Sequence, residues 1–79
     1  MLRGSREAVL RKVQPISVHG QISLDVHFVY PDDDTEQVRV ARIGPEVMPQ
    51  GLEAGDRVIL DFVLGVVTSV KRAGPEPGA

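Results

Sequence analysis

The clearest pattern in the chain is a strict alternation of apolar and polar side chains over residues 21–30. Ser23, Asp25 and His27 occupy polar positions, and an apolar set occupies every second position around them. That apolar set is Ile22, Leu24, Val26, Phe28 and Tyr30. Because successive side chains of a strand point to opposite sides, this period of two predicts a half-buried antiparallel strand over residues 21–30.

A turn signal and a second alternating segment follow this strand. Pro31 presets its own φ, and the three aspartates after it can bond their own backbone, which is typical of a turn. In the segment after the turn, Val38 and Val40 face one way and Arg39 faces the other. We therefore predict a hairpin in which residues 36–43 pair with the preceding strand.

A first strand is predicted before this hairpin, over residues 7–18. The pair His19-Gly20 suits a short hairpin turn, because glycine adopts a positive φ without strain. Pro15 lacks the N–H group that a ladder requires, so we expect its part of the strand to lie at an edge or a bulge.

Residues 5–13 allow two interpretations. Ser5 could cap a short helix in which Glu7 and Arg11 form an i,i+4 pair. The apolar residues of the same segment could equally extend the first strand. We favour the strand.

The connection over residues 44–56 separates this meander from the end of the chain. Its prolines and glycines exclude a long helix and leave room for one turn at most, near Glu46–Met48. Strands are then predicted over residues 57–63 and 66–72, joined by a two-residue reversal.

These elements predict one all-β domain over residues 1–73, followed by a disordered tail over residues 74–79. Five antiparallel strands can cover a single apolar face by curling into a small barrel, which also removes strand edges. An OB-like barrel has this order of elements, but its usual helix would be vestigial here, so an SH3-like barrel stays open. Gly55, before the fourth strand, and Gly65, in the last turn, are expected to lie where a side chain is poorly tolerated.

The connection also resembles a motif of a known group of domains. Residues 45–56 read P-x-x-x-P-x-G-L-x-x-G-D, which resembles a motif in short bacterial β-domains of unknown function. In those domains the motif joins a β-meander to a terminal hairpin, so the resemblance implies the same order of elements here. The family has no assigned activity, and the resemblance therefore implies none.

The composition limits how stable an isolated domain can be. The 79 residues are enough for one domain, and no cysteine is present to form a disulfide or a thiolate. A domain of this size buries only about 60% of its unfolded surface, so we expect added stability from a subunit partner. The chain has no asparagine, and its seven arginines outnumber its two lysines. This favours a heat-adapted source, although a GC-rich genome would also enrich arginine.

Charge and hydropathy exclude several classes of protein. The net charge of −2 at pH 7 argues against strong nucleic-acid binding, which depends on neutralising phosphates. No apolar stretch approaches the roughly 20 residues of a membrane span, and the N-terminus lacks the apolar region of a signal peptide. We therefore expect a cytoplasmic protein without membrane contact.

Side chains that could bind a metal ion are few. Asp32, Asp33 and Asp34 lack the spacing of a calcium loop, and consecutive aspartates in a turn point in different directions. His19 and His27 have no cysteine or matched third ligand with which to complete a zinc site. We therefore expect surface histidines, a solvated acidic turn and no metal site.

Catalysis has little chemistry available in this sequence. No serine lies in a G-x-S-x-G turn, so no nucleophile can be assigned. Asp25 and Asp61 could act as paired carboxylates only if the small barrel formed a cleft between them. We therefore predict a non-catalytic domain that uses no cofactor.

A nucleic-acid-binding barrel is the alternative function. Such a face combines cations with aromatic side chains on which bases stack. The candidate basic stripe consists of Arg11, Lys12, Arg39 and Arg42. Phe28, Tyr30 and Phe62 are all the aromatic residues of the chain, and the alternation places Phe28 in the core. We expect nucleic-acid binding to be weak.

The last hairpin contains the residues through which we predict self-association. Hairpin tips usually carry small polar residues, whereas this one carries Val63 and Leu64. We expect Val67 on the same face as Val63, and Phe62 completes the predicted interface of a homo-oligomer. The alternative is that Leu64 folds back as a plug over the open end of its own barrel.

Overall fold

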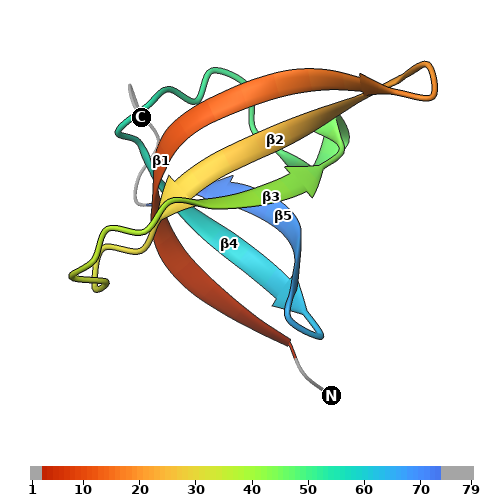
Figure 1. Ribbon diagram of the computed structural model, residues 1–79. Coiled ribbons are helices and arrows are strands. Elements are labelled where there is room, and N and C mark those ends of the chain that lie inside the picture. Colours follow the sequence, from red (N-terminus) through yellow and green to blue (C-terminus); the bar gives the residue numbers. More distant parts are fainter. Residues whose placement is uncertain (1–2, 74–79) are drawn as a thin grey trace, which may run out of the picture.

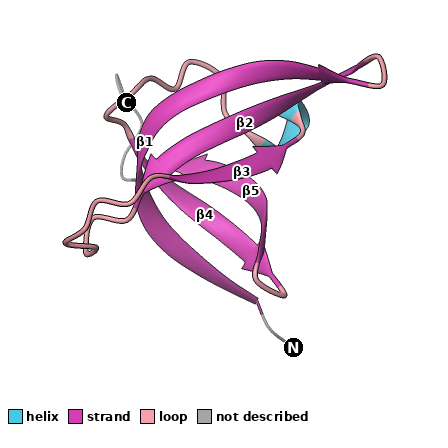
Figure 2. Ribbon diagram, viewed as in Figure 1, coloured by secondary structure: helices cyan, strands magenta, loops and turns pink. Residues whose placement is uncertain are grey.

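The computed structural model describes residues 3–73, which form one antiparallel sheet of five strands and one turn of 3₁₀-helix (Figure 1 and Figure 2). The elements are β1 (Arg3–Val18), β2 (Gln21–Val29), β3 (Arg39–Ile43), η1 (Pro45–Val47), β4 (Arg57–Val63) and β5 (Val66–Arg72). The prediction of an all-β fold with five antiparallel strands is confirmed. The predicted tail, residues 74–79, lies outside the described residues.

The long strand β1 is shared between two parts of the sheet. Its first half, Arg3–Val9, pairs with β4, and its second half, Val9–Val18, pairs with β2. A β-bulge at Arg11 follows the point where the partner changes, and bulges bend a strand and increase its twist. The curved β1 thereby carries the β2–β3 part of the sheet over the β4–β5 part (Figure 1).

The two outer strands of the sheet approach each other without pairing. The strand order is β3-β2-β1-β4-β5, and Cα atoms of β3 and β5 come within 8 Å of one another. No ladder joins β3 to β5 within residues 3–73. The sheet is therefore barrel-like but not closed, and we call the gap between these two strands the seam.

The core lies between the two parts of the sheet and follows the predicted alternation. The buried residues of the core cluster are Ala8, Leu10, Val26, Phe28, Tyr30, Ile43, Val58, Leu60 and Val70. Val29 is buried as well but lies outside this cluster. Each buried Val or Leu side chain contributes roughly 1.5–3 kcal/mol relative to an exposed one. Met48 and Leu52, from the connection before β4, pack against this cluster and cover one end of it.

The start of the first strand differs from the predicted boundary. Residues 5–13 form a strand, as favoured, and the strand begins at Arg3 rather than at residue 7. The reason lies in its partner, because Ser5 pairs with Asp61 in β4 and extends the ladder beyond the apolar residues. Pro15 lies in the half of β1 that pairs only with β2, so its location at a strand edge is confirmed.

The start of the third strand was predicted too early. Residue 36 is not in a strand, because β3 begins at Arg39. Glu36 has a positive φ of 49°, and its N–H donates to the carbonyl of Asp33 at 3.1 Å. The side chain of Asp33 also accepts hydrogen bonds from Thr35, so the turn extends further than its proline and aspartates indicate.

The connection before β4 is a short 3₁₀ turn followed by glycine-punctuated loops, as predicted. Gly55 has a φ of 95°, a backbone conformation that residues with a side chain rarely adopt. The N–H of Gly55 donates to the carbonyl of Leu10 at 2.7 Å, and the N–H of Leu10 donates to the carbonyl of Asp56 at 2.9 Å. The glycine and aspartate that end the P-x-x-x-P-x-G-L-x-x-G-D segment therefore tie the connection to β1.

Candidate interaction surface

The turn between β4 and β5 presents a leucine to solvent. Leu64 and Gly65 have φ values of 53° and 79°, which are typical of a type I′ hairpin turn. A positive φ costs a non-glycine residue about 1 kcal/mol or more, because its Cβ crowds the backbone. The side chain of Leu64 is 69% exposed, so it does not cover the barrel end and the plug interpretation is wrong.

The two-residue turn also decides which face each neighbouring residue occupies. Val63 pairs with Val66, and Phe62 pairs with Val67. Val67 therefore shares the core-facing side with Phe62, and its predicted position on the same face as Val63 is wrong. The error arises because residues 63 and 67 lie on different strands, where cross-strand pairing decides the face rather than sequence spacing.

A groove lies along the seam, next to this turn. We call it the seam groove, and its volume is about 400 Å³. Its lining includes Phe28, Phe62 and Val67. Phe62 and Val67 are only partly buried. Val40 and Val66 line it as well and are 55% and 64% exposed. Two of the four predicted interface residues, Phe62 and Val67, thus line the groove, and Leu64 precedes Gly65 at its border.

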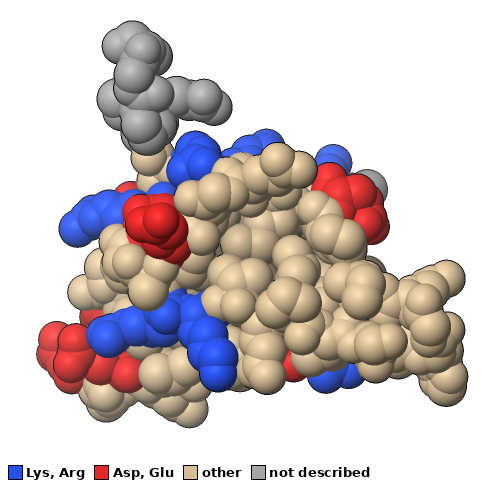
Figure 3. Space-filling view, turned by 90° about the horizontal axis from the view of Figure 1, so that it is seen from above, with Lys and Arg blue, Asp and Glu red and all other residues tan. Residues whose placement is uncertain are grey.

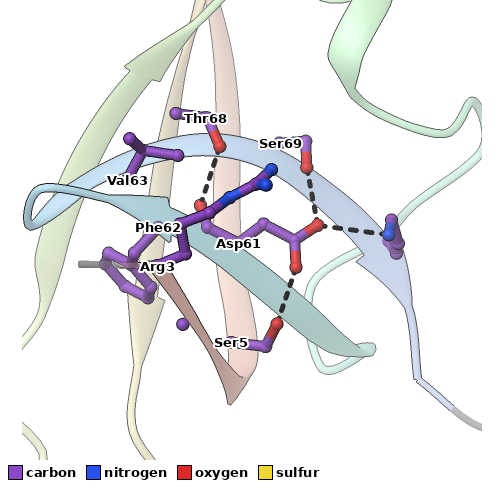
Figure 4. Close-up of a pocket in the computed structure, with 9 residues that line it drawn as sticks. Arg3, Ser5, Asp61, Phe62, Val63, Thr68 and Ser69 are labelled. Carbon is purple, nitrogen blue, oxygen red and sulfur yellow. Dashed lines mark hydrogen bonds and ion pairs between the residues drawn. The ribbon is translucent and has the colours of Figure 1, made fainter. Parts of the chain in front are cut away.

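Val63 and the turn are close to a second feature, a hydrogen-bonded cluster around Asp61 (Figure 4). Ser69 and Ser5 donate to the two carboxylate oxygens of Asp61 at 2.7 Å and 2.8 Å, and Lys71 Nζ lies 3.3 Å from Oδ2. The hydrogen bonds from Ser69 and Ser5, with a smaller contribution from Lys71, hold the pKa of Asp61 below its usual value. This cluster joins β1, β4 and β5 on the outer face, beside a depression of about 460 Å³.

The predicted basic stripe is divided between the two faces of the sheet. Arg39 pairs with Phe28 on the core-facing side, whereas Arg42 pairs with Asp25 on the outer side. Arg42 donates two hydrogen bonds to Asp25, at 2.9 Å and 3.3 Å, and these bonds lower the pKa of Asp25. Arg11 lies 3.6 Å from a carboxylate oxygen of Glu36, and Lys12 is exposed.

Other charged side chains are also interspersed rather than grouped by sign. In the view of Figure 3, blue groups lie at the margins of the face, several of them beside red groups, and the middle of the face is uncharged. The guanidinium of Arg6 lies 3.5 Å from the centroid of the Tyr30 ring and 3.1 Å from Asp32. The ring of Tyr30, which is buried, is therefore covered by a residue of the same chain.

The histidines and carboxylates do not converge on one point. Within residues 3–73, no group of three or more histidine, aspartate or glutamate side chains is placed to hold a metal ion. Asp25 and Asp61, considered as a carboxylate pair, have separate partners in different parts of the sheet. His19 lies in the β1–β2 turn, and His27 Nε2 is buried without a hydrogen-bond partner.

Sequence reasoning missed two residues of this surface, Val40 and Val66. A sequence signal for Val40 exists. Ala41 and Ile43 are both apolar and two residues apart, and in the structure they face the core. Val40 must then point outward. No comparable local signal exists for the groove itself, since its two walls belong to β3 and β5.

No family model, curated protein or solved structure matches this chain. The resemblance of residues 45–56 to short bacterial β-domains stays a prediction. No helix in the described part of the chain, residues 3–73, is long and apolar enough to cross a membrane.

Proposed function

We propose that this chain is a non-catalytic β-barrel module that acts through protein contacts, beginning with self-association through the end of the β4–β5 hairpin. The observation that carries the proposal is Leu64, an apolar residue that is both solvent-exposed and held at an unfavourable φ. Backbone strain of this kind tends to persist where a side chain has a function. Within its own chain, Leu64 gains little burial in return.

The arrangement of the strands supports an OB-like rather than an SH3-like barrel. Strand β1 lies between β2 and β4, and β5 lies beside β3, as in the partly open five-stranded OB barrel. Many OB barrels bind ligands on the outer face of strands 2 and 3. Here that face offers Asp25, His27, Val40 and Arg42 and no aromatic residue, which favours a different use of the fold.

A catalytic role has no support in the polar clusters. Ser5 and Ser69 both donate to Asp61, and no hydrogen bond in residues 3–73 joins either serine to a histidine. A serine nucleophile needs an adjacent base to take its proton. The Asp61 cluster instead links β1, β4 and β5 through side-chain hydrogen bonds and an ion pair.

Weak nucleic-acid binding remains the second candidate, favoured by Arg39 and Arg42 at the seam groove beside Phe28 and Phe62. A phosphate-dependent complex loses affinity steeply as salt rises, whereas an apolar contact between protein chains does not. We expect fluorescence anisotropy with a single-stranded oligonucleotide to show no submicromolar binding at physiological salt. Submicromolar binding that the double variant Arg39→Ala/Arg42→Ala reduces would favour this second function.

The proposal is tested by the oligomeric state of Leu64→Lys, measured by light scattering at tens of micromolar. We expect an oligomeric wild type and a smaller, folded variant, because lysine replaces an apolar contact with a charge that association would bury. Ile22→Lys is the matched control, since Ile22 is 56% exposed in the other hairpin. A monomeric wild type would refute self-association.

A further inference from the structure

The exposed leucine and the groove that could receive a leucine lie on one surface of the molecule. Leu64 immediately precedes Gly65, and Gly65 and Val66 line the seam groove. Five large apolar residues of residues 3–73 are more than half exposed, and Val40, Leu64 and Val66 of that set lie at the groove or its border. The surface therefore combines a projecting apolar side chain with an apolar depression.

The width of the seam limits what can enter it. Neighbouring strands lie about 4.8 Å apart, so a strand inserted between β3 and β5 would need about 9.6 Å between them. Cα atoms of β3 and β5 come within 8 Å of one another. An added strand would have to force the seam apart, whereas a single side chain can enter the groove from outside.

We propose that the occupant of the seam groove is Leu64 of a second copy of this chain. The contact is isologous: Leu64 of each copy enters the groove of the other, and a two-fold axis passes close to the two Gly65 residues. This inference rests on the proposed self-association and specifies its geometry. A two-fold contact uses the same patch on both subunits. Because this patch contains both Leu64 and the groove, two copies satisfy each other and form a closed dimer.

The charge and size of the surface suit this occupant. The groove is lined by Arg39 and Arg42 and by no acidic residue, and the tip from Val63 to Val66 carries no charge that would be buried unpaired. A stable complex buries about 800 Å² on each partner, which is about a seventh of the 5496 Å² surface of this chain. A contact of that size must therefore extend beyond the groove and the hairpin tip onto neighbouring residues of β3 and β5.

Two lysine variants, one in β3 and one immediately before it, test whether the groove is the receiving site. Val40→Lys places a charge in the groove wall, and Val38→Lys places the same charge on a residue that is 52% exposed and outside the groove lining. We expect Val40→Lys to weaken self-association at least tenfold in Kd and Val38→Lys to change it less than threefold. Sedimentation velocity measures Kd, and circular dichroism verifies that both variants are folded.

Cross-linking tests the geometry directly, since the chain contains no cysteine. Leu64→Cys, with an affinity tag that changes its mass, is mixed with untagged Val40→Cys and oxidised. We expect a mixed disulfide species, and no comparable species when His19→Cys replaces Leu64→Cys. A monomeric wild type would refute the proposed function and this inference together. An oligomer that Leu64→Lys dissociates, but that tolerates Val40→Lys and gives no mixed disulfide, would overturn only the inference.

Discussion

Two hairpins of this protein, β1–β2 and β4–β5, have the same two-residue turn with different residues in it. His19-Gly20 joins β1 to β2 with φ values of 51° and 77°, and Leu64-Gly65 joins β4 to β5 with 53° and 79°. Histidine is one of the residues enriched at positive φ, together with asparagine and aspartate, whereas leucine is not. The backbone therefore does not require a leucine at this position.

The two turns also differ in what lies next to them. The β1–β2 hairpin projects away from the rest of the sheet (Figure 1). The turn of the β4–β5 hairpin adjoins the seam groove, because Gly65 lines it. Neither His19 nor Gly20 lines the seam groove. The proposed self-association assigns Leu64 and the groove to one contact, and the following predictions test that assignment.

The largest effect on self-association is expected from exchanging the first turn residues of the two hairpins, His19 and Leu64. Leu64→His gives the second turn the residue that the first turn already tolerates, so the fold should persist while self-association weakens at least tenfold. His19→Leu creates an exposed leucine without an adjacent groove, so it should leave the oligomeric state unchanged. Light scattering on both variants checks this. If His19→Leu alone increased the oligomer size, exposure of a leucine would suffice and the groove would be unnecessary.

A smaller effect, equal in both hairpins, is expected from alanine at the turn glycines. A Cβ added at Gly20 or Gly65 would meet no heavy atom within 4 Å, so the cost comes from the positive φ alone. We expect each variant to lose roughly 1 kcal/mol, or about 4–8 °C in Tm. Thermal melts in the Leu64→His background exclude a contribution from association. An effect at Gly65 but none at Gly20 would show that the two turns differ in their backbones.

The parts of this fold that sequence predicted well depend on local pattern. The strand over residues 21–30 was predicted from an alternation that involves only side chains two positions apart. The reversal at Leu64-Gly65 was predicted from one glycine between two apolar runs. The late start of β3 escaped prediction because Thr35 and Glu36 bond to Asp33 and prolong the turn. That arrangement depends on a particular φ at Glu36, which no periodicity reveals.

The candidate site was predicted only in part, because it depends on long-range pairing. Leu64 stands out in sequence as an apolar residue in a turn. The position of Val67 depends on its pairing with Phe62, and the groove exists only because β1 curves and brings β3 beside β5. The same holds for Arg39 and Arg42, whose separation onto two faces divides the predicted basic stripe.

The two parts of the sheet should also respond differently to acid. Asp61 on β4 interacts with Ser69, Ser5 and Lys71, whereas Asp25 on β2 has Arg42 as its one side-chain partner within residues 3–73. Both pKa values are lowered from the usual 3.8, so both groups contribute stability above about pH 4 that is lost as the pH falls through their folded-state values. We expect Asp61→Asn to lower Tm by a few degrees at pH 7 and Asp25→Asn by less.

The difference between each variant and the wild type should shrink towards pH 3 and below, where the wild-type carboxylates are becoming protonated. Melts at a series of pH values check this, again in the Leu64→His background. If the Tm difference between Asp61→Asn and the wild type stayed constant with pH, the stabilisation by the Asp61 cluster would not depend on the charge of the carboxylate.

The smallest effect is expected from asparagine at the first turn position of each hairpin. Asparagine tolerates a positive φ better than leucine does, so Leu64→Asn should stabilise the isolated chain by about 0.5 kcal/mol. His19→Asn should change stability by less, because histidine already tolerates this conformation. Leu64→Asn should at the same time weaken self-association, which is the usual pattern when a strained residue serves a function. Chemical denaturation of both variants at low protein concentration, together with light scattering at high concentration, measures the two effects separately. If Leu64→Asn destabilised the isolated chain, the leucine would be supporting its own fold, and its exposed position would need a different explanation.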